Sequence, residues 1–317
     1  MFLHKINKYH IFNYKIILYL PIQMIMKRKP LVSVIMPVYN SEEYVQEAIT
    51  SILNQTYPWF EFIIINDGST DHSSEIIDKQ KDDRIRFINH TVNIGNYPRR
   101  NEGCKLAKGE YIFVMDSDDW ASPERMEIQV ETMEHSSNTV VCGTAHMTFG
   151  GEYCFRPINP ELSKINLIFN NGFLHPSLII RKETLENINY YDENYRYASD
   201  YDLMCRIVQQ GNAINLPDVL MKYRRHKQQI SHRHALQQTH YADQIRLNYI
   251  QSCGFIFDQQ QQEIFTHIMG INKNTSHSKT IIENFIENFE TQNAHLNCFN
   301  KLLLKRFLET IKMAYFN

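Results

Sequence analysis

Apolar and polar residues follow two alternating periods along the middle of this chain. Short apolar runs rich in β-branched residues occupy residues 31–39, 60–67, 84–89 and 111–115. Between them, apolar residues recur at helical spacing over about 45–53, 72–80 and 97–107. Strands that alternate with helices are typical of βαβ units, so the pattern predicts an α/β fold with a mostly parallel central sheet flanked by helices.

Two local signals refine these elements. Asn40, followed three residues later by Glu43, is expected to cap the first helix. Further along, residues 138–149 and 175–183 have the pattern of strands, and residues 198–211 have that of a helix beginning at an acidic end and stopping at a glycine.

The residue composition and the apolar pattern change near both ends of the chain. After residue 235 the sequence becomes rich in glutamine and in amphipathic helical segments, so we expect a main domain over 31–235 and a C-terminal helical appendage over 236–317. Residues 1–30 form a leader whose apolar run is too short and too interrupted to span a bilayer. We interpret the leader as disordered and dispensable, with a loose anchor on a membrane surface as the alternative.

Composition narrows the class of protein. The 317 residues are 43% hydrophobic and 12% aromatic, enough for a sizeable core, and the net charge is −2. No general basic field favours nucleic acid as a partner. The six cysteines form no C-x-x-C pair, which indicates reduced thiols in a cytosolic protein and no zinc site.

Three aspartates, Asp116, Asp118 and Asp119, directly follow the apolar run at 111–115. Carboxylates this close repel one another, and Mg²⁺ or Mn²⁺ would offset that repulsion. A solvated acidic turn and a phosphatase with an aspartate nucleophile also fit the local sequence. An EF-hand does not, because Trp120 and Ala121 stand where a ligand and the turn glycine belong.

Motifs for other nucleotide and acyl chemistry are missing. The sequence has neither G-x-G-x-x-G nor G-x-x-x-x-G-K-[ST], and it has no G-x-S-x-G elbow. What it has is five motifs in order: VSVIMPVYNSEEYVQEAITSILNQTY, IINDGSTD, NEGCKLAKGEYIFVMDSDDW, ASDYDL and YRRHKQQIS. In this order the chain, over about residues 31–235, resembles the inverting family 2 glycosyltransferases of the GT-A fold, which is Rossmann-like.

The resemblance implies a nucleotide-diphosphate sugar donor, with UDP the usual nucleotide, and a glycan or lipid-linked acceptor. It places Pro37 and Tyr39 against the base and ribose, and Asp67 against the uracil edge. Asn66 stands where the family often has another acid. Arg100 is a further candidate for the nucleotide site, although it and Arg99 also fit a solvated basic face.

For the metal, the resemblance implies Asp118 as the direct ligand of Mn²⁺ or Mg²⁺, with Asp116 in the metal shell or at the ribose. His226 matches a histidine that approaches the metal or diphosphate. Asp119 and His175 are candidates for the acceptor side, with helix capping as the other role for Asp119. The cations around His226 (Arg224, Arg225 and Lys227) either bind diphosphate or form a solvated face.

The family also implies a general base that takes the proton of the acceptor hydroxyl. Asp200 matches that position, with Ser199 where glutamate is frequent and Asp202 as the local alternative. The resulting prediction is a cytosolic glycosyltransferase, acting in surface polysaccharide assembly at or near the inner face of the membrane. A sugar-nucleotide-binding relative without turnover and a metal-dependent phosphatase are the competing hypotheses.

The last helical segment carries Leu303, Phe307 and Ile311 at helical spacing among lysines and an arginine. Packing on its own domain is the favoured interpretation. Peripheral contact with an anionic membrane is the alternative.

Overall fold

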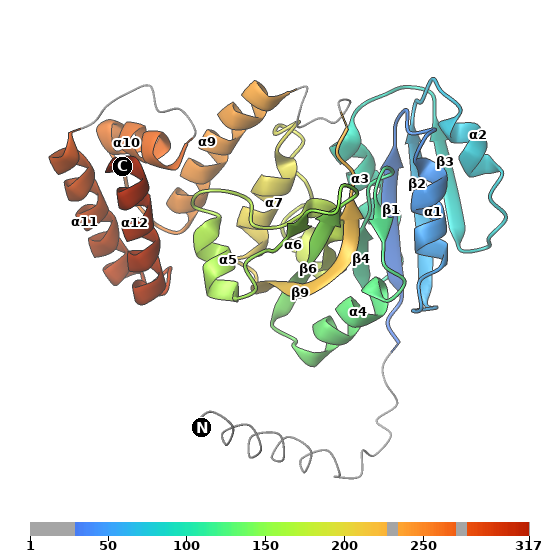
Figure 1. The fold of residues 1–317 in the computed structure, drawn as a ribbon, viewed down its shortest axis with the longest axis horizontal. Helices are drawn as coiled ribbons and strands as arrows, with labels where there is room; N and C mark the ends of the chain where they lie inside the picture. Colours follow the sequence, from blue (N-terminus) through green and yellow to red (C-terminus); the bar gives the residue numbers. More distant parts are fainter. Residues whose placement is uncertain (1–28, 227–233, 271–277, 317) are drawn as a thin grey trace, which may run out of the picture.

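The computed structural model describes residues 29–226, 234–270 and 278–316 (Figure 1). The predictions for the leader and for Lys227 concern residues outside these ranges.

Within this part of the chain, nine strands form one sheet in the order β3-β2-β1-β4-β8-β6-β9-β5, and β7 pairs with β6. The strands run over Val32–Val38 (β1), Phe60–Asp67 (β2), Ile85–His90 (β3), Tyr111–Val114 (β4), Trp120–Ala121 (β5), Thr139–Thr148 (β6), Tyr153–Cys154 (β7), Ile179–Arg181 (β8) and Asn212–Tyr223 (β9). The first four strands are parallel, so their carboxyl ends share one edge. Ligands of open α/β sheets bind at such an edge.

Helices cover both faces of the sheet, as the sequence predicts. On one face α1 (Val45–Leu53), α2 (Ser73–Asp78) and α4 (Arg125–His135) bury their apolar residues against alternate side chains of β1 and β2. On the other face lie α3 (Asn96–Leu106), α5 (Pro160–Asn166), α6 (Lys182–Asn187) and α7 (Ser199–Ile207). The expected α/β class with C-terminal helices is confirmed.

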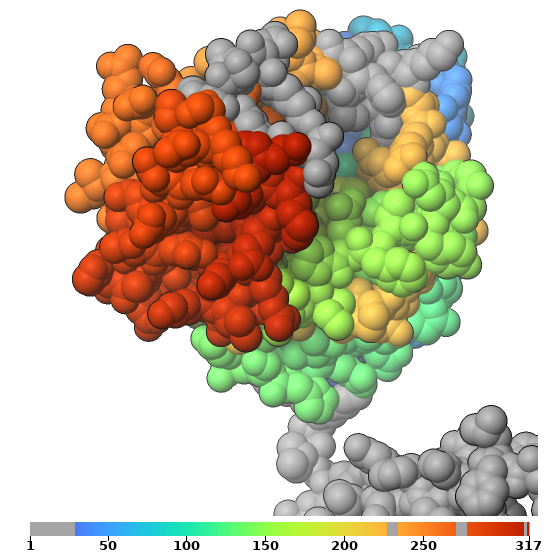
Figure 2. Space-filling view, turned by 60° about the vertical axis from the view of Figure 1, so that its left-hand side comes forward, coloured from blue at the N-terminus to red at the C-terminus, as the bar shows by residue number. Residues whose placement is uncertain are grey.

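The C-terminal helices are α9 (Ala235–Ser252), α10 (Gln259–Met269), α11 (Lys279–Leu296) and α12 (Lys301–Phe316). Their phenylalanine-rich interior belongs to the same hydrophobic cluster as the α3–α7 face of the sheet. In Figure 2 their orange and red surface lies directly against the green surface of the preceding residues. The boundary at residue 235 stays a prediction, but the region packs on the sheet domain through a shared core.

Helix α12 uses its apolar side for this packing. Leu304 and Leu308 are fully buried, and Leu303, Phe307 and Ile311 pack half-buried against the same cluster. None of the described helices has the length and apolar character needed to cross a bilayer.

Two local expectations were wrong, and one strand was missed. Asn40 does not cap α1: it takes a left-handed conformation with φ 49°, and its Oδ1 accepts a hydrogen bond from the Thr70 amide. Helix α1 begins only at Val45. The strand expected over 175–183 shrinks to β8, because a 3-10 turn precedes it and α6 follows it. The long strand β9 was not expected.

Candidate active site

Helix α3 connects three acids that lie far apart in the sequence. The Tyr97 hydroxyl donates to Oδ1 of Asp200 at 3.0 Å, and Arg100, three residues later on the same helical face, forms an ion pair with Asp116. Between them, Arg99 Nε donates to Oδ1 of Asp67 at 2.8 Å. The first turns of α3 therefore gather acids from the ends of β2 and β4 and from the start of α7.

Asp67 is buried and holds the loop that leads into α3. Its Oδ1 accepts from the Ile94 amide at 2.9 Å, in addition to Arg99, and its Oδ2 accepts from the Gly95 amide at 2.8 Å. Gly95, with φ 105°, supplies a backbone conformation that other residues rarely adopt. A carboxylate has about four acceptor positions, so Asp67 retains capacity for one further donor.

The three aspartates after β4 form one compact group. One carboxylate oxygen from each of Asp116, Asp118 and Asp119 lies within 4.8 Å of the others. Asp119 is 1% exposed, its Oδ1 accepts from the Arg224 amide at 2.9 Å, and its Oδ2 is buried without a partner among the described residues. Clustered carboxylates with an unsatisfied buried oxygen fit a hard divalent cation, so the residues present suit Mn²⁺ or Mg²⁺.

Burial dominates the electrostatics of this group. It raises the pKa of Asp116 to about 6, with Arg100 acting in the opposite direction and Asp118 and Asp200 adding to the rise. The pKa of Asp119 is well above its usual value, because of burial and its two acidic neighbours. Because the charge of Asp200 acts on Asp116, the two carboxylates lie near one another in the fold.

Residues that directly follow β9 contact the aspartate group from the opposite side to α3. Nε2 of His226 lies 2.8 Å from Oδ2 of Asp118, and Arg224 Nε donates to the Asp118 carbonyl at 2.7 Å. The Arg224 guanidinium also lies over the rings of Tyr44 and Phe149. Strand β9 thus places His226 beside the acids, where the sequence predicted a metal or diphosphate contact.

Asp200 differs from its neighbour Asp202 in what surrounds it. Asp200 lies in the first turn of α7, accepts from Tyr97 and from Asn171 Nδ2 at 3.4 Å, and has a pKa raised by burial. Asp202 forms a 2.6 Å ion pair with Arg206 one turn along the helix. A carboxylate held by a cation is a poor base, so the geometry favours Asp200 over its local alternative.

The remaining predicted residues take different positions. Pro37 is buried near the end of β1, past the last pairing with β4, whereas Tyr39 is 49% exposed at the mouth of the site. Arg100 is 1% exposed and lies behind Asp116, donating also to the carbonyl of Met115. His175 is buried; its Nε2 lies 2.9 Å from the Tyr191 hydroxyl and its ring contacts Tyr97 edge-on.

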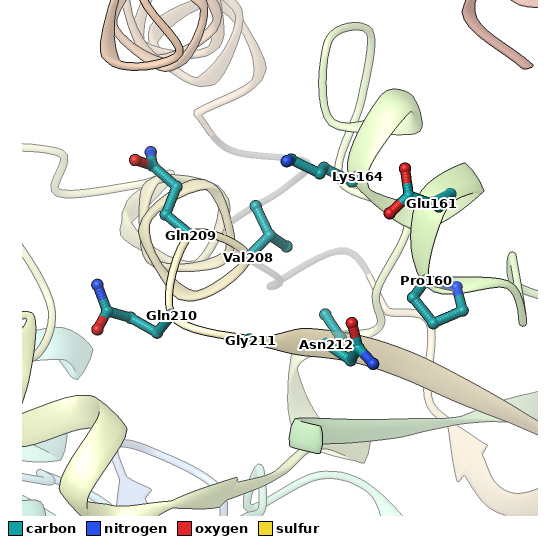
Figure 3. Close-up of a pocket in the computed structure, with 9 residues that line it drawn as sticks. Pro160, Glu161, Lys164, Val208, Gln209, Gln210, Gly211 and Asn212 are labelled. Carbon is teal, nitrogen blue, oxygen red and sulfur yellow. The ribbon is translucent and has the colours of Figure 1, made fainter. Parts of the chain in front are cut away.

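A separate concavity of about 240 Å³ lies away from these acids, between α5 and the turn from α7 into β9 (Figure 3). Its wall carries Glu161, Lys164, Gln209 and Asn212. None of the predicted site residues lines it, and it opens at the start of β9, at the opposite end of that strand from His226.

Comparison with known proteins agrees with the motifs. Residues 33–190 match the model of Glycosyl transferase family 2. An uncharacterized glycosyltransferase of Methanocaldococcus jannaschii is 34% identical over 207 residues, which are 62% of this chain and 71% of the relative. The chain belongs to glycosyl transferase family 2. A second uncharacterized glycosyltransferase, from Haemophilus influenzae, is 32% identical over 65% of this chain and 69% of its own length.

Solved structures support the fold of this family 2 glycosyltransferase. S. aureus TarS 1-349 in complex with UDP aligns with a TM-score of 0.60 over 90% of each chain, at 19% identity. The mannosyltransferase PcManGT of Pyrobaculum calidifontis, in complex with GDP-Man and Mn²⁺, aligns with a TM-score of 0.59 over 91% of this chain and 86% of its own, at 15% identity. The predicted family, GT-A fold and transferase class are confirmed.

Sequence reasoning missed two residues that shape the site. Tyr97 and Asn171 contact Asp200 from 103 and 29 residues away, and neither belongs to a motif that marks it. Arg99 and Arg100 were noted as cations, but their individual acid partners were not predicted. Tyr97 and Arg100 are three residues apart and share one face of α3. This helical spacing is the signal in the sequence that could have indicated that both contact the acids.

Proposed function

We propose that this family 2 glycosyltransferase moves a hexosyl or N-acetylhexosaminyl group from a nucleotide-diphosphate donor, a UDP-sugar, to a hydroxyl of a glycan or lipid-linked acceptor with inversion. The observation that carries the proposal is the joint attachment of Asp200 and Asp116 to one face of α3. It sets a candidate base beside a candidate metal group. Surface polysaccharide assembly is the setting we propose.

The nucleotide would lie along the carboxyl ends of β1 and β2. Half-exposed Tyr39 offers a ring to the base or ribose, and Asp67 offers its remaining acceptor position to a donor group such as a uracil N–H. Pro37 shapes the backbone below them. The solved relatives named above hold UDP and GDP-Man, which supports a nucleotide-sugar donor without choosing the base.

The acids after β4 would hold Mn²⁺ or Mg²⁺ through Asp118 and Asp116, with Asp119 reaching the same position through its unpartnered oxygen. When bound, such an ion supplies positive charge opposite the diphosphate as it leaves. His226 and Arg224 lie on the same side and are the protein's own groups for the departing phosphates. Arg100 orients Asp116 from behind, so we reassign it from nucleotide binding to positioning.

Asp200 would accept the proton of the attacking hydroxyl. Its raised pKa makes it a stronger base than an ordinary aspartate, and the Tyr97 hydroxyl holds one oxygen in place. The buried His175, whose pKa is lowered by burial and by Arg100, packs behind Tyr97 and would act on the acceptor side through it.

Location follows from the proposed substrates. Nucleotide sugars are made in the cytoplasm, so we propose that the enzyme works there, at the inner face of the membrane if its acceptor is lipid-linked. The apolar side of α12 is used in packing. Contact with an anionic membrane would therefore use the exposed Lys301, Lys305 and Arg306 on the opposite side.

A panel of UDP- and GDP-sugars, tested by thermal shift and by donor hydrolysis with and without Mn²⁺, tests the proposal. We expect a selective, Mn²⁺-dependent shift with one donor, and slow release of its nucleotide as water replaces the acceptor. Donor binding without any turnover would indicate the non-catalytic relative. Release of phosphate from simple phosphoesters, without donor selectivity, would indicate a phosphatase instead.

A further inference from the structure

The β6–β7 hairpin carries a cluster of cationic and neutral nitrogen groups that the proposed chemistry does not use. His146 of β6 pairs directly with Cys154 of β7, so their side chains lie on one face of the hairpin. Arg156 follows two residues after Cys154, and its charge acts on His146. The Tyr223 ring of β9 meets the His146 ring edge-on at 5.9 Å between centroids.

Arg156 lacks the partner that a half-buried arginine ordinarily has. Its Nε is fully buried without a hydrogen bond, and within the described parts of the chain the guanidinium forms no ion pair. Nδ1 of His146, a residue 2% exposed, is also buried without a partner there. The two terminal nitrogens of the Arg156 guanidinium are not among the enclosed atoms and form no hydrogen bond within the described ranges, so they remain available to the acceptor oxygens of a ligand.

The charge at this face is uncompensated. Burial and the nearby charges of Arg156 and Arg225 lower the pKa of His146 to about 4, and burial lowers the pKa of Arg156. The one acid of the hairpin that pairs with this group is Glu152, which forms a 2.8 Å ion pair with Arg225 at the exposed rim. Arg156 itself faces no described acid in an ion pair, so the face attracts an anion.

The cluster adjoins the proposed reaction centre. Tyr223 directly precedes Arg224, whose amide donates to Asp119 and whose Nε donates to the carbonyl of Asp118. Arg225, which pairs with Glu152 of the hairpin, directly precedes His226, whose Nε2 lies 2.8 Å from Oδ2 of Asp118, so the cluster adjoins the acid group. The donor diphosphate has its own candidate groups in Arg224, His226 and the ion that Asp118 would hold, which leaves this face for the other substrate.

We propose that Arg156, with Arg225 and with His146 beside them, binds a phosphate or carboxylate group carried by the acceptor. This inference rests on the proposed transferase function and names the chemical class of its acceptor: an anionic glycan or a phosphate-linked lipid carrier, as opposed to a neutral oligosaccharide.

The test measures binding of small anions to the full chain saturated with UDP and Mg²⁺, so that the donor site is occupied. Glycerol 3-phosphate and glucuronate serve as probes for the two anions, and glycerol is the neutral control. We expect both or one of the anions, but not glycerol, to bind by calorimetry. Arg156→Gln should weaken that binding at least about tenfold, since a charge-assisted hydrogen bond is lost.

Arg306→Gln, at an exposed arginine on α12, is the matched control and should bind the anions like the wild type. Arg156→Met should keep the melting temperature of the wild type, because an arginine without a partner contributes little to the fold. A clear drop in melting temperature for both Arg156 variants would assign the residue a structural role and overturn the proposal.

Two other outcomes separate this inference from the proposed function. If the wild type binds UDP but neither anion, or if Arg156→Gln weakens UDP binding and leaves anion binding unchanged, the acceptor subsite is refuted while the transferase proposal stands. If the wild type binds no nucleotide in the absence of the probes, the proposed function itself fails.

Discussion

The acid-bearing end of the sheet buries charged side chains, whereas the last two helices leave theirs at least partly exposed. Around α3, Arg99, Arg100 and Asp119 are all at least nine-tenths buried. Among the described residues of α11 and α12, no charged side chain is buried, and the interior consists of phenylalanine, leucine and isoleucine with one buried asparagine, Asn293. Buried charge is a weak source of stability, whereas buried apolar surface is a strong one. We therefore expect substitutions at the end of the sheet to affect the reaction, and substitutions inside the last two helices to affect the stability of the fold.

The largest effect expected is on the first region's chemistry. Asp200→Asn removes the candidate base while keeping the size and shape of the side chain. Donor hydrolysis should fall by about 10²- to 10⁴-fold with little change in donor affinity. Asp202→Asn, which removes an acid already paired with Arg206, is the control. Equal losses in both variants would contradict the choice of Asp200.

Substitutions inside the last two helices should lower the stability of the fold without changing nucleotide binding. Leu308→Ala leaves a cavity in the core of α12 and should lower the free energy of unfolding by about 2–5 kcal/mol. UDP affinity of the folded protein should stay unchanged. Leu302→Ala, on the exposed side of the same helix, should change stability by less than about 0.5 kcal/mol. Chemical denaturation measures both, and equal effects would contradict the packing described.

A smaller effect is expected from Tyr97→Phe, which deletes the hydroxyl bonded to Asp200 and leaves the ring stacked on Tyr191. The rate should fall about tenfold, in line with one hydrogen bond to a charged group. That bond lowers the pKa of Asp200, so its loss should also move the acid limb of the rate profile to higher pH. Tyr190→Phe is a control on a neighbouring ring. An unshifted limb would show that Tyr97 does not act on Asp200.

The smallest expected effect is the pH dependence of donor hydrolysis by the wild type. Asp200 accepts a proton only when ionised, and burial raises its pKa above the usual 3.8. The rate of donor hydrolysis should therefore increase with pH through this raised pKa and level off above it, measured with a buffer series at saturating Mn²⁺. A rate that falls with increasing pH over the same range would contradict a carboxylate base.

The sequence predicts the first region well because its signals are local. Strands β1, β2 and β4 are mostly apolar, and polar or turn-forming residues end or closely follow each of them. Strand β9 escapes prediction because Pro217 and Asp218 break its pattern. The irregular register against β6, between Thr144 and Ala145, lies at that position.

The features of the site that the sequence does not predict depend on contacts between residues far apart in the chain. The pairing of Arg99 with Asp67, and of Tyr97 with Asp200, depends on how α3 rotates against the sheet, which no local pattern encodes. The mistaken cap at Asn40 has a similar origin, since its side chain bonds to Thr70 in the next loop instead of to α1. Local capping rules do not take account of such a competing partner.

A crystal of the full chain grown with UDP and Mn²⁺, measured for the anomalous signal of manganese, tests the central claim most directly. The account predicts one strong peak at coordination distance from Asp118, with the diphosphate on the same ion, the uracil at Asp67 and Asp200 open to the same cleft. A manganese peak away from Asp116, Asp118 and Asp119, or a nucleotide bound remote from Asp67, would contradict it.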